Sequence, residues 1–327
     1  MKNNNNSVTC IGNAIVDVIS KCSEEFLEQN NITKAAMNLI NEDRSTQLYE
    51  LLEKPEVISG GSAANTAVGI SMFGSDCSFI GKVKNDELGQ AFVIDINNMG
   101  VNFTTPTSKT GPRTASSIIL VTPDAERSMN TYLGACVNLS RDDLDHNTIK
   151  NSYIVYLEGY LFDPPKAKEA FIETAKIAKK AGNLVAMTLS DGFCVERHRS
   201  DFISFISNYV DILFCNDDEI QSLFQCSRED AKNKIKTLDI ETAITLGSEG
   251  SLVFKAGQWF EIKSINVDNV EDTTGAGDLY ASGYLHGRSN NLEPSKCAKI
   301  ASISASEIIS HIGARPKASL KGLIQNI

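Results

Sequence analysis

Short runs of apolar, often β-branched residues recur along the chain, and segments with helical periodicity lie between them. We predict strands at VTCIGNAIVDVI (8–19), CSFIGKV (77–83), YIVYLEGY (153–160), LVAMTLS (184–190), DILFCN (211–216) and TAITLG (242–247). The clearest helix is predicted over 164–182, where small and apolar residues share one face, prolines open the segment and Gly182 closes it. Strands that alternate with helices predict a mostly parallel sheet covered on both faces.

Two regions, 17–58 and 106–136, depart from this alternation with polar, strand-like pieces. In TASSIILVTPDAERSMNTYL (114–133) the apolar positions alternate on both sides of a turn, which predicts an antiparallel hairpin. We expect the two regions to form a small β-sheet lid on a single domain that spans 1–327. A further hairpin is predicted over 250–265, at the edge of the main sheet.

Composition and charge narrow the class of protein. Hydrophobic residues at 42% and charged residues at 22% are ordinary for a soluble globular protein. The net charge of −10 argues against nucleic acid or an anionic membrane as the main partner. No run reaches transmembrane length, no segment resembles a signal peptide, and the eight scattered cysteines fit free thiols in a reducing compartment. We therefore expect a cytoplasmic protein that binds small molecules.

Glycines, carboxylates and amides follow the predicted strands, where open α/β sheets bind their ligands. They are Asn13 and Asp17, GGSAAN (60–65), Glu158, NDDE (216–219), TLGSEG (245–250) and DTTGAGD (272–278). The last is a glycine-rich turn before a helix, which suits an anion, although Asp278 could also be a plain helix cap. The absence of GxxxxGK[ST] excludes a P-loop, and GNAIVD in place of GxGxxG disfavours a dinucleotide-dependent dehydrogenase.

On these motifs the chain resembles the ribokinase-like (PfkB) family of sugar and nucleoside kinases, and within it the bacterial adenosine-kinase branch. GGSAANTAVGISMFGSDCSFIGKVKNDELG (60–89) resembles the family's N-terminal signature, and DTTGAGDLYASGYL (272–285) resembles its C-terminal signature. The resemblance implies a three-layer α/β sandwich and ATP-dependent phosphorylation of a primary hydroxyl. Adenosine is the first choice of acceptor. The alternatives are a kinase for another nucleoside or a free sugar, and a non-catalytic nucleotide-binding protein.

The resemblance also implies roles on the phosphate side. Asp278 would be the general base, which a carboxylate within hydrogen-bond reach of the hydroxyl can be. The backbone N–H groups implied to form an anion hole are those of Gly275, Ala276 and Gly277. The residues implied to contact ATP are Asn216, Thr245, Gly247 and Gly250. Glu219 would help to place Mg²⁺ through water, although Asn216 and Glu219 also fit a helix-capping box. The positions implied to bind a monovalent cation such as K⁺ are Asp272, Thr274 and Gly313.

On the acceptor side, the implied contacts are Asn13, Asp17, Gly61, Ser62, Asn65, Glu158 and Tyr160. Ser62 stands where ribokinases typically carry lysine, which counts against free ribose. Ala63 and Ala64 replace the Thr-Gln of eukaryotic adenosine kinases, so the pocket differs from theirs. Tyr160 matches a position where adenosine kinases place an aromatic ring against the purine. The open edges of the lid could pair between two copies, so a monomer and a homodimer both stay open.

Overall fold

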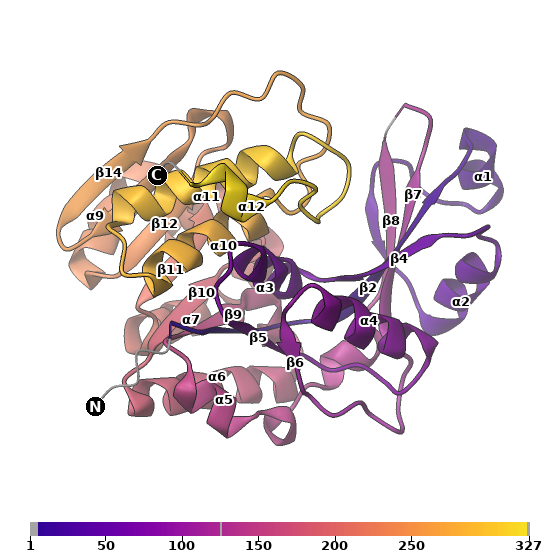
Figure 1. Ribbon diagram of the computed structural model, residues 1–327, viewed down its shortest axis with the longest axis horizontal. Coiled ribbons are helices and arrows are strands. Elements are labelled where there is room, and N and C mark those ends of the chain that lie inside the picture. The colour runs from indigo at the N-terminus through magenta and orange to yellow at the C-terminus, as the bar shows by residue number, and fades with distance from the viewer. Residues whose placement is uncertain (1–5, 125, 326–327) are drawn as a thin grey trace.

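The larger of two sheets forms the centre of the molecule (Figure 1). The structure is a computed structural model that describes residues 6–124 and 126–325. Across this sheet the strands lie in the order β14 (Gln258–Ile262), β13 (Ser251–Lys255), β12 (Glu241–Thr245), β11 (Ile212–Asn216), β10 (Leu184–Thr188), β9 (Ile154–Glu158), β1 (Val8–Ile11), β5 (Cys77–Ile80) and β6 (Asn102–Phe103). From β12 to β6 the strands pair in parallel, while β13 and β14 form an antiparallel hairpin at one edge. The mostly parallel sheet and its edge hairpin are therefore confirmed.

Helices cover both faces of this sheet, which makes three layers. One face carries α3 (Ser62–Met72), α4 (Glu87–Asn98), α10 (Ala276–Ser289) and α11 (Pro294–Ile308), with the short α12 (Leu320–Leu323) beside α3. The other face carries α5 (His146–Asn151), α6 (Pro165–Ala181), α7 (Gly192–Tyr209), α8 (Asp217–Phe224) and α9 (Arg228–Leu238). Neighbouring strand residues point to opposite layers, so Tyr156 packs into the first core and Val155 into the second.

Helix α6 follows the prediction made from its sequence. It begins at Pro165 and ends before Gly182, whose φ of 77° is the left-handed conformation that favours glycine at a helix C-terminus. The predicted apolar face is buried, with Ala170, Phe171 and Thr174 fully covered. The helix packs on β9 and β10, and it thereby supports strands whose carboxyl ends carry candidate site residues.

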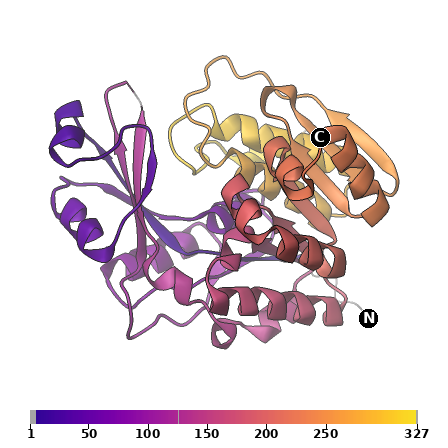
Figure 2. The same cartoon turned by 180° about the vertical axis from the view of Figure 1, so that it is seen from behind.

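A second, smaller sheet stands beside the main body (Figures 1 and 2). Its strands lie in the order β3 (Met37–Leu39), β8 (Arg127–Tyr132), β7 (Ala115–Val121), β2 (Ile15–Lys21) and β4 (Glu56–Gly60). Strands β7 and β8 are antiparallel, which confirms the hairpin predicted within 114–133. Helices α1 (Glu24–Gln29) and α2 (Glu42–Glu50) lie on the face that points away from the main body, where Leu48 packs with Val16 and Val18. The opposite face is turned toward the main body.

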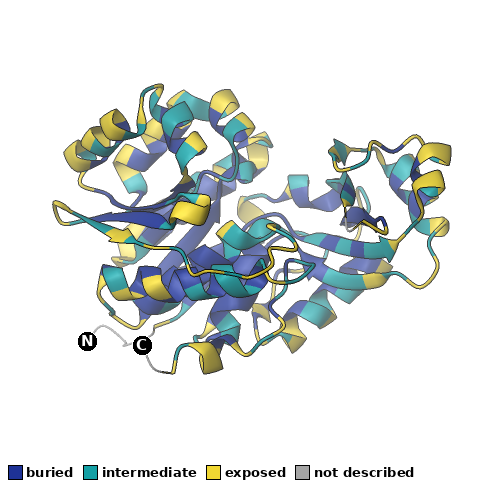
Figure 3. Ribbon diagram, turned by 90° about the horizontal axis from the view of Figure 1, so that it is seen from above, coloured by how far each residue is buried: buried dark blue, intermediate teal, exposed yellow. Residues whose placement is uncertain are grey.

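Burial follows these layers, because buried residues concentrate in the main sheet and on the helix faces that pack against it (Figure 3). All eight cysteines are free thiols, as predicted, and six of them are buried. Among the described residues, no helix combines the length and the apolar character that crossing a bilayer requires.

Candidate active site

The glycine-rich turn and the first turn of α10 form the phosphate-side part of the candidate site. Gly275 precedes the helix with a φ of 80°, a conformation that a residue with a side chain adopts only at a cost. The N–H of Ala276 donates to the carbonyl of Thr273 at 3.2 Å, so it is already used within the turn. The N–H groups of Gly277 and Asp278 lie in the first helical turn and have no intrahelical acceptor. They are the free donors of a helix end that favours negative charge.

The carboxylate of Asp278 is held by α3 rather than by its own helix. Ser62 Oγ donates to it at 2.6 Å and Asn65 Nδ2 at 3.1 Å, while Thr66 Oγ1 donates to the Asp278 carbonyl at 3.2 Å. Loss of hydration raises the pKa of Asp278 to about 6, against the opposing effect of the Ser62 and Asn65 hydrogen bonds and the charge of Arg315. A carboxylate with this pKa is ionised at neutral pH and can accept a proton.

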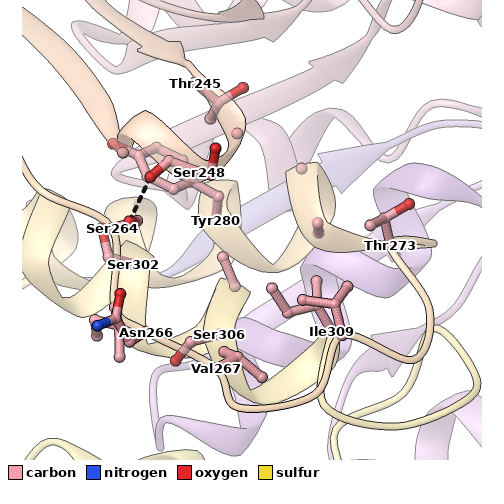
Figure 4. Close-up of a pocket in the computed structure, with 17 residues that line it drawn as sticks. Thr245, Ser248, Ser264, Asn266, Val267, Thr273, Tyr280, Ser302, Ser306 and Ile309 are labelled. Carbon is pink, nitrogen blue, oxygen red and sulfur yellow. Dashed lines mark hydrogen bonds between the residues drawn. The ribbon is translucent and has the colours of Figure 1, made fainter.

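Two cavities meet at the start of α10. The smaller, of about 100 Å³, is lined by Ser62, Asn216, Glu219 and Asp278, among other residues. The larger, of about 530 Å³, extends between the ATP-side loop and α11 (Figure 4). Gly277 lines both cavities, as do Thr245 and Tyr280. The turn therefore separates a small polar chamber from a volume large enough for part of a nucleotide.

The larger cavity contains the predicted ATP-side residues Thr245, Gly247 and Gly250. Its remaining wall was not predicted, because it comes from the segment 264–270 and from one face of α11, neither of which carries a recognisable motif. Ser264 fixes this segment by donating its Oγ to the carbonyl of Ser248 at 2.6 Å (Figure 4). Other residues of this wall are Ile265, Val267, Val270, Ser302 and Ile309. Their mostly apolar side chains suit a flat heterocycle better than a charged group.

Asn216 and Glu219 form the reciprocal capping box that opens α8. Asn216 accepts from the Glu219 N–H at 2.8 Å, and Glu219 accepts from the N–H and the Nδ2 of Asn216 at 3.0 and 2.8 Å. Burial raises the pKa of Glu219 to about 7. Both residues also line the small cavity, so the capping and ligand-binding interpretations are compatible. Within the described residues, no group of three or more His, Cys, Asp or Glu side chains could hold a metal directly.

The monovalent-cation role that the resemblance implies for Asp272 stays a prediction, and in the structure its carboxylate is engaged by other groups of the protein. Its carboxylate forms an ion pair of 2.6 Å with Arg127 Nη1, and the two side chains are 7% and 10% exposed. It also accepts from the N–H of Thr274 and of Gly313, each at 3.0 Å. Burial opposes ionisation, but these hydrogen bonds and the Arg127 charge lower the pKa of Asp272 overall. The carboxylate is already neutralised, and we assign no step to K⁺.

On the acceptor side, Glu158 organises the backbone around the end of β1. It accepts from Asn13 Nδ2 at 2.8 Å, from the Asn13 N–H at 3.3 Å and from the Ala63 N–H at 2.9 Å. Burial raises the pKa of Glu158 to about 7. Gly61, with a φ of 97°, lies so close to the Asn13 carbonyl that a Cβ would collide with it. Glu158 therefore shapes the acceptor side by holding Asn13 and the start of α3.

Two amide oxygens on this side are buried without a hydrogen-bond partner. They are Asn13 Oδ1 and Asn65 Oδ1, and both residues were predicted to contact the acceptor. An unpaired buried acceptor is costly, so a ligand that donates hydroxyl hydrogens would stabilise both. Asp17 lies on β2, and the charges of Arg315, Arg127 and Asp278 act on its carboxylate. Burial raises the pKa of Asp17 to about 6.

Tyr160, the remaining predicted acceptor residue, lies just after β9, and the charges of Glu158 and Asp278 act on its phenol. It packs with the core on the α6 and α7 side of the sheet and lines neither cavity at the start of α10. Its N–H donates to Ser190 Oγ at 3.3 Å, and burial together with a hydrogen bond to Asp191 raises the pKa of its phenol. Two arginines that no sequence motif indicated also act on this site. Arg127 acts on Asp17, and Arg315 acts on both Asp17 and Asp278.

Comparison with known proteins agrees with this geometry. Residues 5–320 match the family described as pfkB family carbohydrate kinase. The structure of adenosine kinase from Sinorhizobium meliloti is 44% identical, with a TM-score of 0.87 and 97% of each chain covered. The structure of a probable sugar kinase protein from Rhizobium etli CFN 42 is 43% identical, with a TM-score of 0.87, and covers 97% of this chain and 99% of that chain. Adenosine kinase of Dictyostelium discoideum is 25% identical over 96% of this chain and 98% of its own length.

The chain therefore belongs to the pfkB family of carbohydrate kinases. It is a phosphotransferase, and kinases of this family use ATP. The family resemblance, the ribokinase-like fold and the kinase class predicted from the sequence are confirmed.

Proposed function

We propose that the protein transfers the γ-phosphoryl group of Mg·ATP to a primary hydroxyl of a nucleoside, with adenosine as the acceptor and AMP as the product. The position of Asp278 carries this proposal. Its carboxylate is held by Ser62 and Asn65 of α3, while the neighbouring Gly277 lines both cavities. An acceptor hydroxyl beside α3 and a phosphate at the start of α10 would meet at this carboxylate.

The proposed reaction needs one base and one set of donors. Asp278 takes the proton of the acceptor hydroxyl as its oxygen forms a bond to the γ-phosphorus, and the bond from that phosphorus to the β–γ bridging oxygen breaks to release ADP. The N–H groups of Gly277 and Asp278 stabilise the negative charge on the transferring group. Gly275 permits the tight turn that presents them. The N–H of Ala276 contributes less to this charge stabilisation, because it donates within the turn.

Mg²⁺ would supply charge neutralisation on the ATP phosphates. The protein side of the small cavity fits it, because Glu219 is a buried carboxylate beside Asn216 and Asp278. Magnesium retains several waters, and one carboxylate can order them without direct coordination. The protein itself would bind ATP through the loop of Thr245, Gly247 and Gly250, and through the apolar wall of the larger cavity.

Arg127 is a positively charged side chain of the second sheet that reaches the turn before α10. It belongs to β8 and pairs with Asp272 in that turn. Its Nε and Nη2 are buried without a hydrogen-bond partner. We propose that the second sheet, formed from the regions 17–58 and 106–136, acts as a lid that brings these donors to the phosphoryl group and excludes water.

A nucleoside suits the acceptor side because the lid face toward the main body carries both polar and apolar side chains near Asp17. Ser117 pairs with Asp17 on one side and its hydroxyl lies 2.9 Å from the Thr131 hydroxyl, whereas Ile58 pairs with Asp17 on the other side. Strand register places Ile19 and Ile58 on the same face as Asp17, with Ile119 opposite Ile19 and Met129 opposite Ile119. These side chains can cover a purine ring, whereas the hydroxyls of a free sugar leave them in contact with polar groups. The similarity to the Sinorhizobium meliloti adenosine kinase supports the same choice.

The experiment that tests the proposal is a panel of nucleosides and sugars with Mg·ATP, followed by ADP release and by identification of the phosphorylated product. We expect adenosine to give the highest kcat/KM, and ADP release by the Asp278→Asn variant to be slower than in the wild type by a factor of roughly 10²–10⁴. Faster turnover of fructose or ribose than of adenosine would sink the adenosine assignment and leave the kinase class intact. ADP release with no phosphorylated acceptor in the whole panel would contradict the proposed reaction.

A further inference from the structure

Arg315 joins the candidate site from the far end of the chain. It lies in the segment between α11 and α12, and its Nη1 donates to the carbonyl of Ala64 in the first turn of α3 at 3.3 Å. Its Nη2 donates to the carbonyl and to the Oγ of Ser59 on β4, the latter at 2.8 Å. Ala64 and Ser59 flank the Gly60–Gly61 turn. One guanidinium therefore donates hydrogen bonds to residues on both sides of the turn that leads from the second sheet into α3.

The hydrogen-bond network of Arg315 continues through Ser59 to Asp95. The Oγ of Ser59 donates to Asp95 Oδ2 at 2.6 Å, and its N–H donates to the same oxygen at 2.8 Å. Asp95 belongs to α4, so a helix, a strand and the C-terminal segment meet at one side chain. The planar guanidinium presents donors in fixed directions, a geometry that a lysine ammonium cannot reproduce.

Arg315 is also a positive charge that acts on two carboxylates of the site, those of Asp17 and Asp278. Both carboxylates act back on it. Its Nε is buried and has no hydrogen-bond partner. The other charged or titratable groups that act on or respond to Asp278 are Asp17 of β2, Glu158 and Tyr156 of β9, and Tyr160 just after β9. All of these are acids, so Arg315 supplies the compensating charge for Asp278, while Asp17 is compensated by both Arg315 and Arg127.

We propose that Arg315 is a positioning residue that fixes the Gly60–Gly61 turn, so that Ser62 and Asn65 at the start of α3 hold the Asp278 carboxylate, and that its positive charge favours the ionised form of this carboxylate. This inference rests on the proposed function, because it concerns the ionisation of the proposed base. A buried carboxylate without a nearby opposite charge retains its proton to higher pH. Loss of the Arg315 charge would therefore leave the base protonated at neutral pH, although Arg315 itself touches neither substrate.

The test compares three variants by the pH dependence of kcat at saturating adenosine and Mg·ATP. Arg315→Met removes charge and hydrogen bonds, and its acid limb should move upward by about 1–3 pH units, the effect of losing an opposite charge at close range. Arg315→Lys retains the charge, so its limb should stay near that of the wild type while the KM for adenosine rises. Ser59→Ala removes the two hydrogen bonds of the Ser59 hydroxyl, to Asp95 and from Arg315, but retains the Arg315 charge, so it should leave the limb in place. Recovery of kcat at high pH in the methionine variant would separate a changed ionisation from a damaged fold.

An unchanged limb in a folded Arg315→Met protein would overturn the proposal. If that variant does not fold, the lysine variant decides, since a limb displaced despite the retained charge would also overturn it. The Asp278→Asn variant separates this outcome from a failure of the proposed function. Full activity in that variant would show that Asp278 is not the base, whereas its loss of activity together with an unmoved Arg315→Met limb would reject only the role of Arg315.

Discussion

The carboxylate of Asp278 accepts a hydrogen bond of 2.6 Å from the hydroxyl of Ser62, although the two residues lie 216 positions apart in the chain. Ser62 begins α3 and Asp278 stands in the first turn of α10, so two helices of one layer present their N-terminal ends to the same point. This contact joins the two family signatures in space. It also fixes the rotamer of the proposed base before any substrate binds, which reduces the cost of orienting it.

Asp278→Asn should lower kcat by roughly 10²–10⁴, the range for losing a positioned acid–base group. The asparagine can still accept from Ser62, so the fold and the affinity for ATP should change little. The measurement is steady-state kinetics beside thermal unfolding and ATP binding. Ser62→Ala is the matched control, because it removes the hydrogen bond but keeps the base, and it should retain far more activity. A kcat within a few-fold of wild type in the asparagine variant would mean that Asp278 only caps the helix.

The pH dependence of kcat should report Asp278. Its pKa is raised to about 6, and the base acts only when ionised, so kcat should be level above this pH and fall as the pH drops through it. The KM for adenosine should respond at higher pH, because the pKa of Glu158 is raised to about 7 and its carboxylate holds Asn13 and Ala63. Glu158→Gln should abolish the KM transition near 7 and leave the kcat transition near 6. Identical profiles in both proteins would contradict this division of roles.

Gly277→Ala should lower the rate of phosphoryl transfer without lowering the stability of the fold. Gly277 does not require a left-handed φ, and a Cβ built on it has no neighbour within 4 Å, because it projects into the space of the two cavities. The fold should therefore be as stable as wild type, and alanine favours the helix. The added methyl stands where phosphate would contact the backbone, so kcat/KM for ATP should fall.

Gly275→Ala serves as the contrasting variant for this prediction. At a φ of 80° and with Ala314 Cβ 3.2 Å from the built Cβ, the substitution should cost about 1–2 kcal/mol of unfolding free energy. Calorimetry and kinetics on both proteins test the pair. Normal turnover in Gly277→Ala would place the phosphate elsewhere.

Glu241 should matter for stability and not for chemistry. It is a buried carboxylate at the amino end of β12, with Arg288 Nε at 2.8 Å, Lys255 Nζ at 2.9 Å and the Tyr284 hydroxyl at 2.7 Å. Glu241→Ala leaves Arg288 largely buried without its partner, so the free energy of unfolding should fall by about 3–5 kcal/mol. At low temperature kcat should stay near wild type, because Arg288 lies in the last turn of α10, far along the helix from Asp278.

The control for Glu241 is Glu261→Ala, at an exposed position of the edge strand β14. This change should alter the free energy of unfolding by no more than about 0.5 kcal/mol. Chemical denaturation of the three proteins measures the difference. Equal stability of the Glu241→Ala protein and the control would mean that the ion pairs contribute nothing.

The sequence by itself determined the alternating α/β pattern, helix α6, the two hairpins and where the glycine- and carboxylate-rich motifs lie along the chain. It did not predict that the run 8–19 divides into β1 and β2, which belong to different sheets. Period-two apolar runs and the amphipathic pattern of α6 are local properties, and a local pattern is enough to predict a strand, a helix or a hairpin. The turn at Gly275 and the helix-capping pair of Asn216 and Glu219 are also local, so both could be located without a structure. Parallel strands then place their carboxyl ends at one edge of the sheet, which brings these motifs together.

Only the tertiary structure decided which charges compensate one another. Arg127 reaches from β8 of the second sheet to Asp272 in the turn before α10, and Arg315 reaches Ser59 and Ala64 from the opposite end of the chain. Neither arginine carries a local pattern, because an ion pair between distant segments depends on the register and packing of everything between them. The same reason explains why no pattern in the sequence shows that an arginine pairs with the carboxylate of Asp272 in the folded chain.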